Sequence, residues 1–162
     1  MDLFLVRHAI AQDPSEAQPD AERARTARGQ RRFRESGRGL RRLEAPLGGV
    51  VHSPLVRAAQ TAALLAPWLE GPVVASELLT ASPGEPLLAL LAETGASRLA
   101  VVGHEPWLGE LASLLLTGDL RHGGNFPFRK GGVLWLSGEL QPGQMALGGA
   151  LAPRVLRRVT RA

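Results

Sequence analysis

The chain has 162 residues, a formal net charge of +4 and no cysteine. Without cysteine it has no disulfide framework, no thiol nucleophile and no thiolate ligand for a metal. No apolar run approaches the length that spans a membrane, and the N-terminal residues are typical of a strand rather than of a secretory signal. We therefore expect one domain over residues 1–162, located in the cytoplasm and without membrane contact.

Apolar runs alternate with longer amphipathic stretches, which predicts an α/β fold with a largely parallel sheet. The expected strands cover 3–6, 49–52, 73–75 and 99–103, and the expected helices cover 27–43, 54–69, 86–93 and 106–116. The polar residues 9–22 predict a loop over the site, and 117–132 a glycine-rich loop. Residues 132–136 and 145–151 predict a closing antiparallel pair around Pro142-Gly143.

Arg7 and His8 directly follow the first expected strand. Ligands of open α/β sheets bind beyond the carboxyl ends of the strands, so this position places a guanidinium and an imidazole in a candidate phosphoryl-binding site. An Arg-His pair alone is weak evidence, because a second one occurs at Arg121-His122. That pair lies in the glycine-rich loop without a strand to hold it, so we do not assign His122 to the site.

Two further strand ends carry basic side chains. Ser53 and Pro54 predict a helix start, with Ser53 as N-cap, and this places Arg57 one turn into the helix, where an anion is favoured. The strand at 99–103 ends at His104, just before another expected helix. The carboxyl ends of parallel strands share one sheet edge, so we expect Arg7, His8, Arg57 and His104 to form one site.

Three motifs, in this order, resemble the histidine phosphatase superfamily, the phosphoglycerate mutase-like proteins. They are Leu-Val-Arg7-His8-Ala9, Ser53-Pro-Leu-Val-Arg57-Ala-Ala-Gln-Thr61-Ala and Val-Val-Gly103-His104-Glu-Pro. The similarity extends over roughly positions 1 to 138. Residues 25–29 also look like the family's Leu-Thr-x-x-Gly start of the first helix, with Arg25 where leucine is usual. The resemblance implies a three-layer α/β/α sandwich with a mostly parallel sheet.

Within the superfamily, the short chain and the Gly-His-x-Pro motif are similar to the SixA-type phosphohistidine phosphatases. The resemblance implies that neutral His8 attacks phosphorus while its second ring nitrogen donates to a backbone carbonyl. Arg7 and Arg57 would hold the phosphoryl oxygens, and His104 would stabilise charge in the transition state. We expect no metal or other cofactor, since these side chains supply the positive charge that Mg²⁺ would otherwise supply.

Each of these residues also has a purely structural interpretation. His8 could be an ordinary hydrogen-bonding side chain, Arg57 a solvated helix residue, and His104 a cap for the helix that follows it. For His52 a structural role is the default. The segment from Lys130 to Gly132 could line the substrate mouth or simply form a turn into the last strands.

A general acid is not evident in the sequence. Hydrolysis of a phosphomonoester benefits from an acid that protonates the leaving oxygen, whereas imidazole leaves more easily. Thr80 stands where many relatives carry glutamate, and the nearby candidates are Glu77 and Glu85. We therefore favour phosphohistidine on a protein partner of the histidine-phosphotransfer type as the substrate. The alternatives are a small-molecule phosphomonoesterase of the same superfamily, which would use Glu77 or Glu85, and a non-catalytic binding module.

Arginines are concentrated between Arg23 and Arg42, where nine of them accompany one acid, Glu35. A nucleic-acid surface is disfavoured, because Phe33 is the only aromatic residue in the segment and no binding motif is recognised. Two interpretations remain open, a solvated helix face and a surface that steers an acidic phosphoprotein towards the site.

Overall fold

The computed structural model describes residues 1–13, 19–43, 46–126 and 128–159. Its strands are β1 (Asp2–Arg7), β2 (Gly49–His52), β3 (Val73–Ala75), β4 (Arg98–Gly103), β5 (Val133–Gly138) and β6 (Met145–Leu151). Its α-helices are α1 (Ala27–Leu43), α2 (Val56–Ala63), α3 (Glu85–Glu93), α4 (Trp107–Thr117) and α5 (Pro153–Val159). Short 3₁₀ helices are η1 (Asp20–Glu22), η2 (Ala66–Trp68), η3 (Glu77–Thr80) and η4 (Leu120–Asn125).

The six strands form one mixed sheet in the order β3-β2-β4-β1-β5-β6. The first four strands in this order are mutually parallel, whereas β5 is antiparallel to β1 and to β6. This confirms the expected, mostly parallel sheet and its closing antiparallel pair. Because β4 lies between β1 and β2, the strands that precede His8, Ser53 and His104 are direct neighbours.

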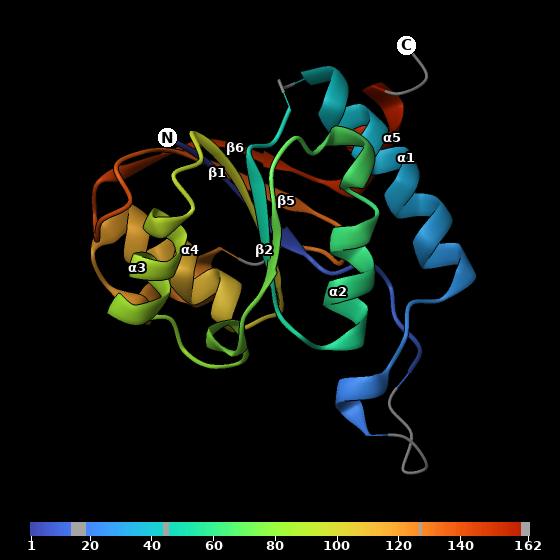
Figure 1. The fold of residues 1–162 in the computed structure, drawn as a ribbon, viewed down its shortest axis with the longest axis horizontal. Coiled ribbons are helices and arrows are strands. Elements are labelled where there is room, and N and C mark those ends of the chain that lie inside the picture. Colours follow the sequence, from blue (N-terminus) through green and yellow to red (C-terminus); the bar gives the residue numbers. More distant parts are fainter. Residues whose placement is uncertain (14–18, 44–45, 127, 160–162) are drawn as a thin grey trace.

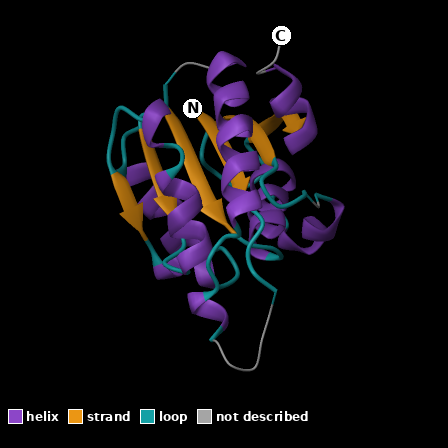
Figure 2. Cartoon of the chain, turned by 90° about the vertical axis from the view of Figure 1, so that its right-hand side faces the viewer, coloured by secondary structure: helices purple, strands orange, loops and turns teal. Residues whose placement is uncertain are grey.

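Helices cover both faces of the sheet (Figure 1). The reason is that the side chains along β1 alternate between the two faces. Leu3 and Leu5 point into the core beneath α3 and α4, whereas Phe4 and Val6 belong to the core shared with α1, α2 and α5. Figure 2 shows the sheet between the two helical layers. The expected three-layer α/β/α sandwich is confirmed.

The expected helix at 54–69 is wrong at both of its ends. Helix α2 begins only at Val56, because the Ser53 hydroxyl bonds to the Leu55 N–H and to His104 instead of capping a helix that starts at Pro54. The helix ends at Ala63 and gives way to η2, which contains Pro67. Proline lacks an N–H and disfavours a helical residue before it, so the α-helix does not continue.

Four regular elements were not predicted. Helix α5, which starts at Pro153, follows β6 without any intervening loop signal. The 3₁₀ helix η3 lies between the expected strand 73–75 and the expected helix 86–93, and η1 and η4 lie inside segments expected to be loops. Pro14, part of the expected loop at 9–22, lies outside the described residues. In the part of the chain that the structure describes, we find no helix both long and apolar enough to cross a membrane.

Candidate functional site

The four predicted site residues gather at the carboxyl edge of three adjacent strands. Arg7 is the last residue of β1, where it pairs in register with Gly103 of β4, so His8 and His104 extend from neighbouring strand ends. The centroids of the two imidazole rings are 5.2 Å apart, with the ring planes at 51°. Arg57 is the second residue of α2, the helix that follows β2. The structure therefore brings together all four residues.

His8 is 5% exposed, and its ring is fixed by a backbone hydrogen bond. Nδ1 lies 2.7 Å from the carbonyl oxygen of Ala9. A carbonyl only accepts, so Nδ1 carries the proton and Nε2 of the neutral ring keeps its lone pair. Burial lowers the pKa of His8 to about 4; the Ala9 carbonyl opposes this shift, and the positive charges of Arg57, Arg7 and Lys130 add to it. The ring is therefore neutral near pH 7, with the tautomer expected of a nucleophile.

His104 is equally buried, with 4% of its surface exposed. Its Nε2 lies 2.8 Å from the Ser53 hydroxyl, whereas its buried Nδ1 has no hydrogen-bond partner among the described residues. Burial, followed by the charge of Arg57 and the proximity of His8, lowers the pKa of His104 to about 3. The His104 side chain does not cap α4, because its Nε2 bonds to Ser53 and its Nδ1 has no partner among the described residues; only its backbone carbonyl accepts from the N–H of Leu108.

Arg7 and Arg57 each present a guanidinium to this edge of the sheet. Nη1 of Arg7 donates to the carbonyl of Phe128 at 2.7 Å. Arg57, which is 6% exposed, donates from Nη1 to the carbonyl of Asp20 at 2.6 Å and from Nη2 to its carboxylate at 2.8 Å. The Nε atoms of both arginines are buried and lack a partner among the described residues. Each guanidinium thus has one desolvated donor that a ligand oxygen would satisfy.

The contact between Asp20 and Arg57 could not be expected from the sequence. It lies in η1, within the loop predicted to cover the site, and its carboxylate also forms an ion pair with Arg23 at 2.8 Å. Desolvation opposes the shift, but the hydrogen bond to Arg57 and the charges of Arg57 and Arg23 lower the pKa of Asp20 on balance. The expectation that this loop reaches the site is confirmed for its described end.

Other backbone and side-chain contacts hold the site residues in place. The Thr61 hydroxyl donates to the Arg57 carbonyl at 2.6 Å and accepts from the Ala9 N–H at 3.0 Å, which ties α2 to the residue after His8. The N–H of Gly131 donates to the carbonyls of Arg7 and His8. Gly131 has a φ of +79°, a left-handed conformation that suits glycine. The segment 130–132 is therefore a turn that anchors the strand end, and its Lys130 adds positive charge near His8.

The similarity of residues 25–29 to a helix start has a clear structural basis. The Thr26 hydroxyl accepts from the N–H of Gly29 at 3.0 Å, three residues on, as an N-cap does. A Cβ on Gly29 would lie 2.1 Å from the carbonyl oxygen of Ile10, so only glycine fits there. Arg25 is 9% exposed and bonds through its N–H and its side chain to Gln60.

Glu105 is a further, half-buried acid near the site that the sequence reasoning did not assign. Its carboxylate accepts from the N–H groups of Gly109 at 3.2 Å and Phe128 at 3.5 Å. Burial raises its pKa, while those two bonds and the charge of Arg7 oppose the shift. Glu105 therefore caps α4 and ties it to the segment that holds Arg7. The sequence feature that could have predicted this contact is the position of Glu105 just before an expected helix, where an acidic side chain can accept from an N–H of the first turn.

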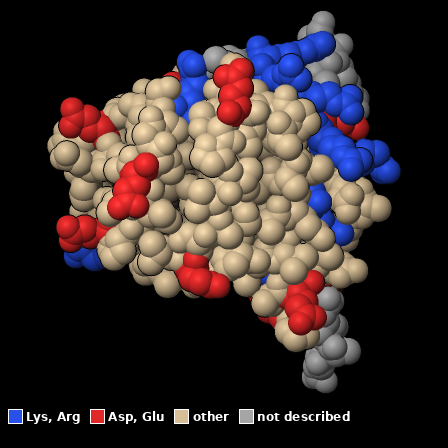
Figure 3. All heavy atoms as spheres, viewed as in Figure 1, with Lys and Arg blue, Asp and Glu red and all other residues tan. Residues whose placement is uncertain are grey.

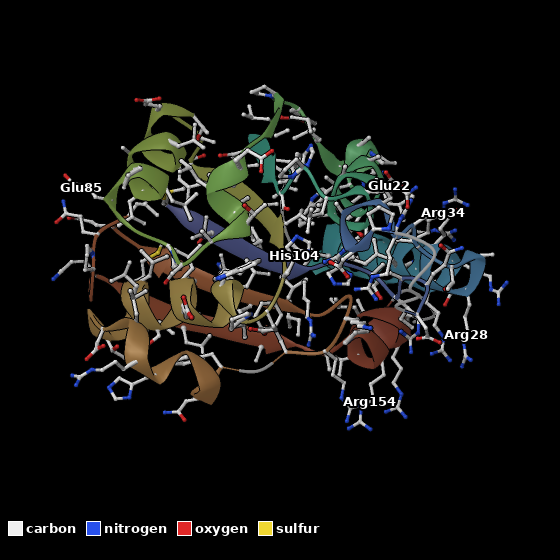
Figure 4. The ribbon with its side chains drawn as sticks, turned by 90° about the horizontal axis from the view of Figure 1, so that it is seen from below. Glu22, Arg28, Arg34, Glu85, His104 and Arg154 are labelled. Atoms are coloured by element: carbon white, nitrogen blue, oxygen red, sulfur yellow. The ribbon has the colours of Figure 1, made fainter. Side chains whose placement is uncertain are left out.

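The two acids proposed from sequence lie in different places. Glu85 begins α3 and, in Figure 4, projects from the end of the molecule opposite Arg28, well away from the central His104. Glu77 is exposed and begins η3, directly after β3 and thus at the same sheet edge as the site. Among the described residues, Glu77 has no hydrogen bond to Arg7, His8, Arg57 or His104.

The other two histidines, His122 and His52, are not among the four candidate site residues. His122 is exposed in η4, a 3₁₀ helix capped by Asp119, whose side chain accepts from the N–H of Arg121. His52, the last residue of β2, bonds through Nδ1 to the Ser53 carbonyl at 2.8 Å. Within the described ranges, no group of three or more potential metal-ligating His, Cys, Asp or Glu side chains is found.

Comparison with known proteins agrees with this arrangement. The family model of the histidine phosphatase superfamily (branch 1) matches residues 3–80. An uncharacterised protein of Picosynechococcus sp. is 34% identical over 141 residues, which are 84% of either chain. The chain therefore belongs to the histidine phosphatase superfamily and is SixA-like. The members of this superfamily are enzymes of the phosphatase class.

Solved structures of this fold cover nearly the whole chain. The protein histidine phosphatase SixA in complex with tungstate has a TM-score of 0.78 at 23% identity and covers 96% of this chain and 99% of its own. A protein assigned as the phosphohistidine phosphatase SixA of Nakamurella multipartitia has a TM-score of 0.73 at 26% sequence identity, and the match covers 94% of this chain and 95% of that one. The alpha-ribazole phosphatase of Shigella flexneri has a TM-score of 0.76 at 19% sequence identity, and the match covers 94% of this chain and 97% of that one. The last of these is similar in fold, so the fold alone does not select a substrate.

Proposed function

We propose that this protein is a phosphohistidine phosphatase that acts on a phosphorylated protein through a phosphoenzyme formed on His8. The observation that carries the proposal is a set of three buried nitrogens without partners among the described residues, namely Nε of Arg7, Nε of Arg57 and Nδ1 of His104. They come from three strand-to-helix connections, and the ring of His104 and the charges of Arg57 and Arg7 act on a neutral histidine with a free lone pair. A tetrahedral oxyanion would satisfy all three donors at once.

We assign the proton of neutral His104 to Nδ1, with Nε2 accepting from the Ser53 hydroxyl at 2.8 Å. Ser53 is buried, and among the described residues Nε2 of His104 is the acceptor found for its hydrogen, while its oxygen accepts from the Leu55 N–H at 3.3 Å. The neutral ring then carries its proton on Nδ1 and can donate it to a phosphoryl oxygen. The low pKa of His104 means that it acts as a neutral hydrogen-bond donor, and the two arginines supply the formal charge.

In the first chemical step, Nε2 of His8 attacks phosphorus, the new N–P bond forms, and the N–P bond of the substrate breaks. The substrate imidazole leaves with the electron pair of that bond and takes a proton from solvent water. Charge on the equatorial oxygens is balanced by Arg7 and Arg57. In the second step, water attacks phosphorus, the bond to His8 breaks, and inorganic phosphate is released.

The substrate preference rests on the leaving group. Among the described residues, the acids that contact the site or the segments holding it are Asp20, which the charges of Arg57 and Arg23 keep ionised, and the half-buried Glu105, both of whose carboxylate oxygens accept backbone N–H bonds. Imidazole needs less protonation than an alkoxide, so phosphohistidine fits such a site better than a phosphomonoester. Between Arg57 and His104 the chain forms only α2, η2, β3, η3, α3 and β4, without an inserted subdomain. This leaves room for a side chain presented by another protein, and we propose a single domain over 1–162.

A small-molecule phosphomonoesterase is the second candidate, and one observation favours it. Glu77 lies just beyond the carboxyl end of β3, on the same sheet edge as His8, and is the exposed acid that this edge offers to a leaving group. That enzyme would lose activity on phosphomonoesters when Glu77 is neutralised.

The decisive experiment compares turnover of a phosphohistidine-containing protein with that of a panel of phosphomonoesters. We expect a higher kcat/KM for the former, and trapping with radiolabelled substrate should place an acid-labile, base-stable phosphate on the peptide that contains His8. His8→Ala should abolish turnover and labelling, while His122→Ala, on the exposed 3₁₀ helix, should change neither. Label on another residue would overturn the mechanism, and a preference for phosphomonoesters would favour the second candidate.

A further inference from the structure

A groove rich in arginine runs between α1 and α5 and ends at the candidate site. Its inner part is a hollow of about 560 Å³ that begins at Arg7 and has Arg32, Arg129, Lys130 and Arg154 among its lining residues. Its outer part, of about 700 Å³, shares Arg32 and Arg154 with the inner part and continues along both helices to Arg28 and Arg158. We call the two hollows together the basic groove. In Figure 3, blue side chains gather at the upper right, over α1 and α5.

Two packed helices form the walls of this groove, so its shape is built into the fold. Phe33 of α1 and Leu156 of α5 are buried in the same core. The Ser36 hydroxyl lies 3.4 Å from the carbonyl of Pro153, and Arg42 donates to the carbonyl of Val159 at 2.8 Å. These contacts join the two helices at both ends of α5. The basic side chains of the two helices are therefore held opposite one another rather than spread over one solvated face.

The charge of the groove is almost entirely of one sign. Glu35 is the only acid among the described residues that line it, and it pairs with Arg157 at 3.9 Å. In the described part of the chain, no carboxylate lies within ion-pair distance of Arg32, Arg129, Lys130 or Arg154. The whole chain carries a net charge of only +4, so this face concentrates positive charge that the rest of the molecule balances. Like charges held together in a concave surface attract an anionic partner.

The floor of the inner hollow is apolar. It includes Ala9, Ile10, Phe33 and Pro153, and a cationic rim surrounds it. Phe33 is 3% exposed, so it offers no ring face on which a nucleobase could stack. Each hollow alone has the size of a small-molecule site, and their continuity along two helices suits an extended chain. An apolar floor with a cationic rim fits a polypeptide that alternates acidic and apolar side chains.

We infer that the basic groove binds an acidic segment of the phosphoprotein substrate and directs the adjacent phosphohistidine to His8. Arg7 and Ala9, the residues on either side of His8, both line the inner hollow, so a segment seated in the groove would end beside the reacting histidine. This inference rests on the proposed function for the identity of the reacting group, whereas the binding of an acidic segment is tested independently of catalysis. Charge in the groove should act mainly on association and KM.

The binding test uses a fluorescein-labelled octaglutamate peptide, with labelled octaserine as the uncharged reference. Fluorescence anisotropy would give the Kd for the wild type and for the Arg32→Gln/Arg154→Gln variant. We expect about tenfold weaker binding for this variant and a smaller salt dependence. The matched control is Arg38→Gln/Arg41→Gln, which removes the same charge from α1 but on the side that faces Trp68. The control should bind within about twofold of the wild type. Equal losses in both variants would overturn the groove assignment.

Arg154→Gln alone, on the exposed start of α5, provides a second variant if the double variant fails to fold. An eight-residue oligothymidylate and vesicles that contain anionic lipid complete the comparison. If either binds through Arg32 and Arg154 more tightly than octaglutamate does, the acidic-segment assignment is wrong.

Catalysis separates this inference from the proposed function. Wild type and groove variant should hydrolyse free N-phosphohistidine equally, whereas a phosphohistidine peptide flanked by glutamates should show a several-fold higher KM with the groove variant. If the wild type hydrolyses neither substrate, the proposed function fails even where octaglutamate binding holds. If it hydrolyses both and the KM is the same in the two proteins, only the groove inference fails.

Discussion

The carboxylate of Asp20 lies 2.8 Å from Nη2 of Arg57, and the backbone carbonyl of Asp20 lies 2.6 Å from Nη1 of the same side chain. One residue of the loop thus occupies two of the donors of a buried guanidinium, and leaves its Nε without a partner among the described residues. The pair orients Arg57 and also places a negative charge next to the proposed phosphoryl site, whose ligand is itself an anion.

Asp20→Asn should tighten the binding of inorganic phosphate. Asparagine keeps an oxygen that can accept from Arg57 but removes the charge that repels the ligand, so we expect a several-fold lower inhibition constant for phosphate. Glu93→Gln, an exposed residue at the end of α3, is the control with the same change in charge. Weaker phosphate binding in Asp20→Asn would mean that orientation of Arg57 by the carboxylate outweighs its repulsion of the ligand.

The free energy of unfolding should fall as the pH drops below the pKa of an unperturbed histidine. The folded-state pKa values of about 4 for His8 and about 3 for His104 lie below the unfolded value of 6.5. Below pH 6.5 the unfolded chain therefore binds more protons than the folded one, and above it the two histidines have no effect. At pH 4.5 each should lower the free energy of unfolding by about 2.5 kcal/mol relative to pH 7.5.

Urea unfolding at pH 7.5 and 4.5 measures this difference. The variant His8→Asn/His104→Asn should lose markedly less stability between the two pH values than the wild type does. An equal loss in both proteins would show that the histidines do not carry the acid sensitivity.

Ser53→Ala should lower kcat by about tenfold, because a missing hydrogen bond of this kind costs about 1–3 kcal/mol and His104 would lose its fixed orientation. Ser113→Ala is a matched control, since Ser113 is also fully buried but bonds to the backbone of Asp119. Both variants should lose some stability, measured by thermal unfolding, and only Ser53→Ala should lose activity. Ser53→Thr, which retains the hydroxyl, should recover part of the lost kcat. Equal kcat values in the two alanine variants would refute a positioning role for Ser53.

Neutralising the candidate acids tests the choice of leaving group. With a phosphohistidine substrate, Glu77→Gln and Glu85→Gln should each change kcat less than about threefold, because a general acid that matters contributes about 10²- to 10⁴-fold. Steady-state kinetics with phosphohistidine and with a phosphomonoester provide the comparison. A loss of a hundredfold or more with the phosphohistidine substrate would reverse our preference.

Exhaustive chelation should leave activity unchanged, because the proposed mechanism takes its positive charge from Arg7 and Arg57. The measurement is the turnover rate before and after treatment with a chelator, with a divalent ion added back in a third sample. Inactivation that one added ion reverses would contradict the absence of a cofactor.

The sequence alone determined the strands and the chemistry at their ends. The runs before His8, Ser53 and His104 are short, apolar and local, and the periodicity of neighbouring residues is enough to predict them. The ranges of α1 and β2 agree with the prediction to the residue. The expectation that one ring nitrogen of His8 donates to a backbone carbonyl is confirmed, and the structure shows that the nitrogen is Nδ1 and the carbonyl that of Ala9.

Only the tertiary structure decided which distant groups complete the site. The partner of Arg57 is 37 residues away, that of His104 is 51 residues away, and Arg7 bonds to Phe128 across 121 residues. No local pattern encodes such contacts, since they depend on how loops cross the edge of the folded sheet. The arginines of α1 are a plain charged face in the sequence. They become one wall of a groove only because α5, a helix without a recognised sequence signal, packs its buried Leu156 against the same core as Phe33.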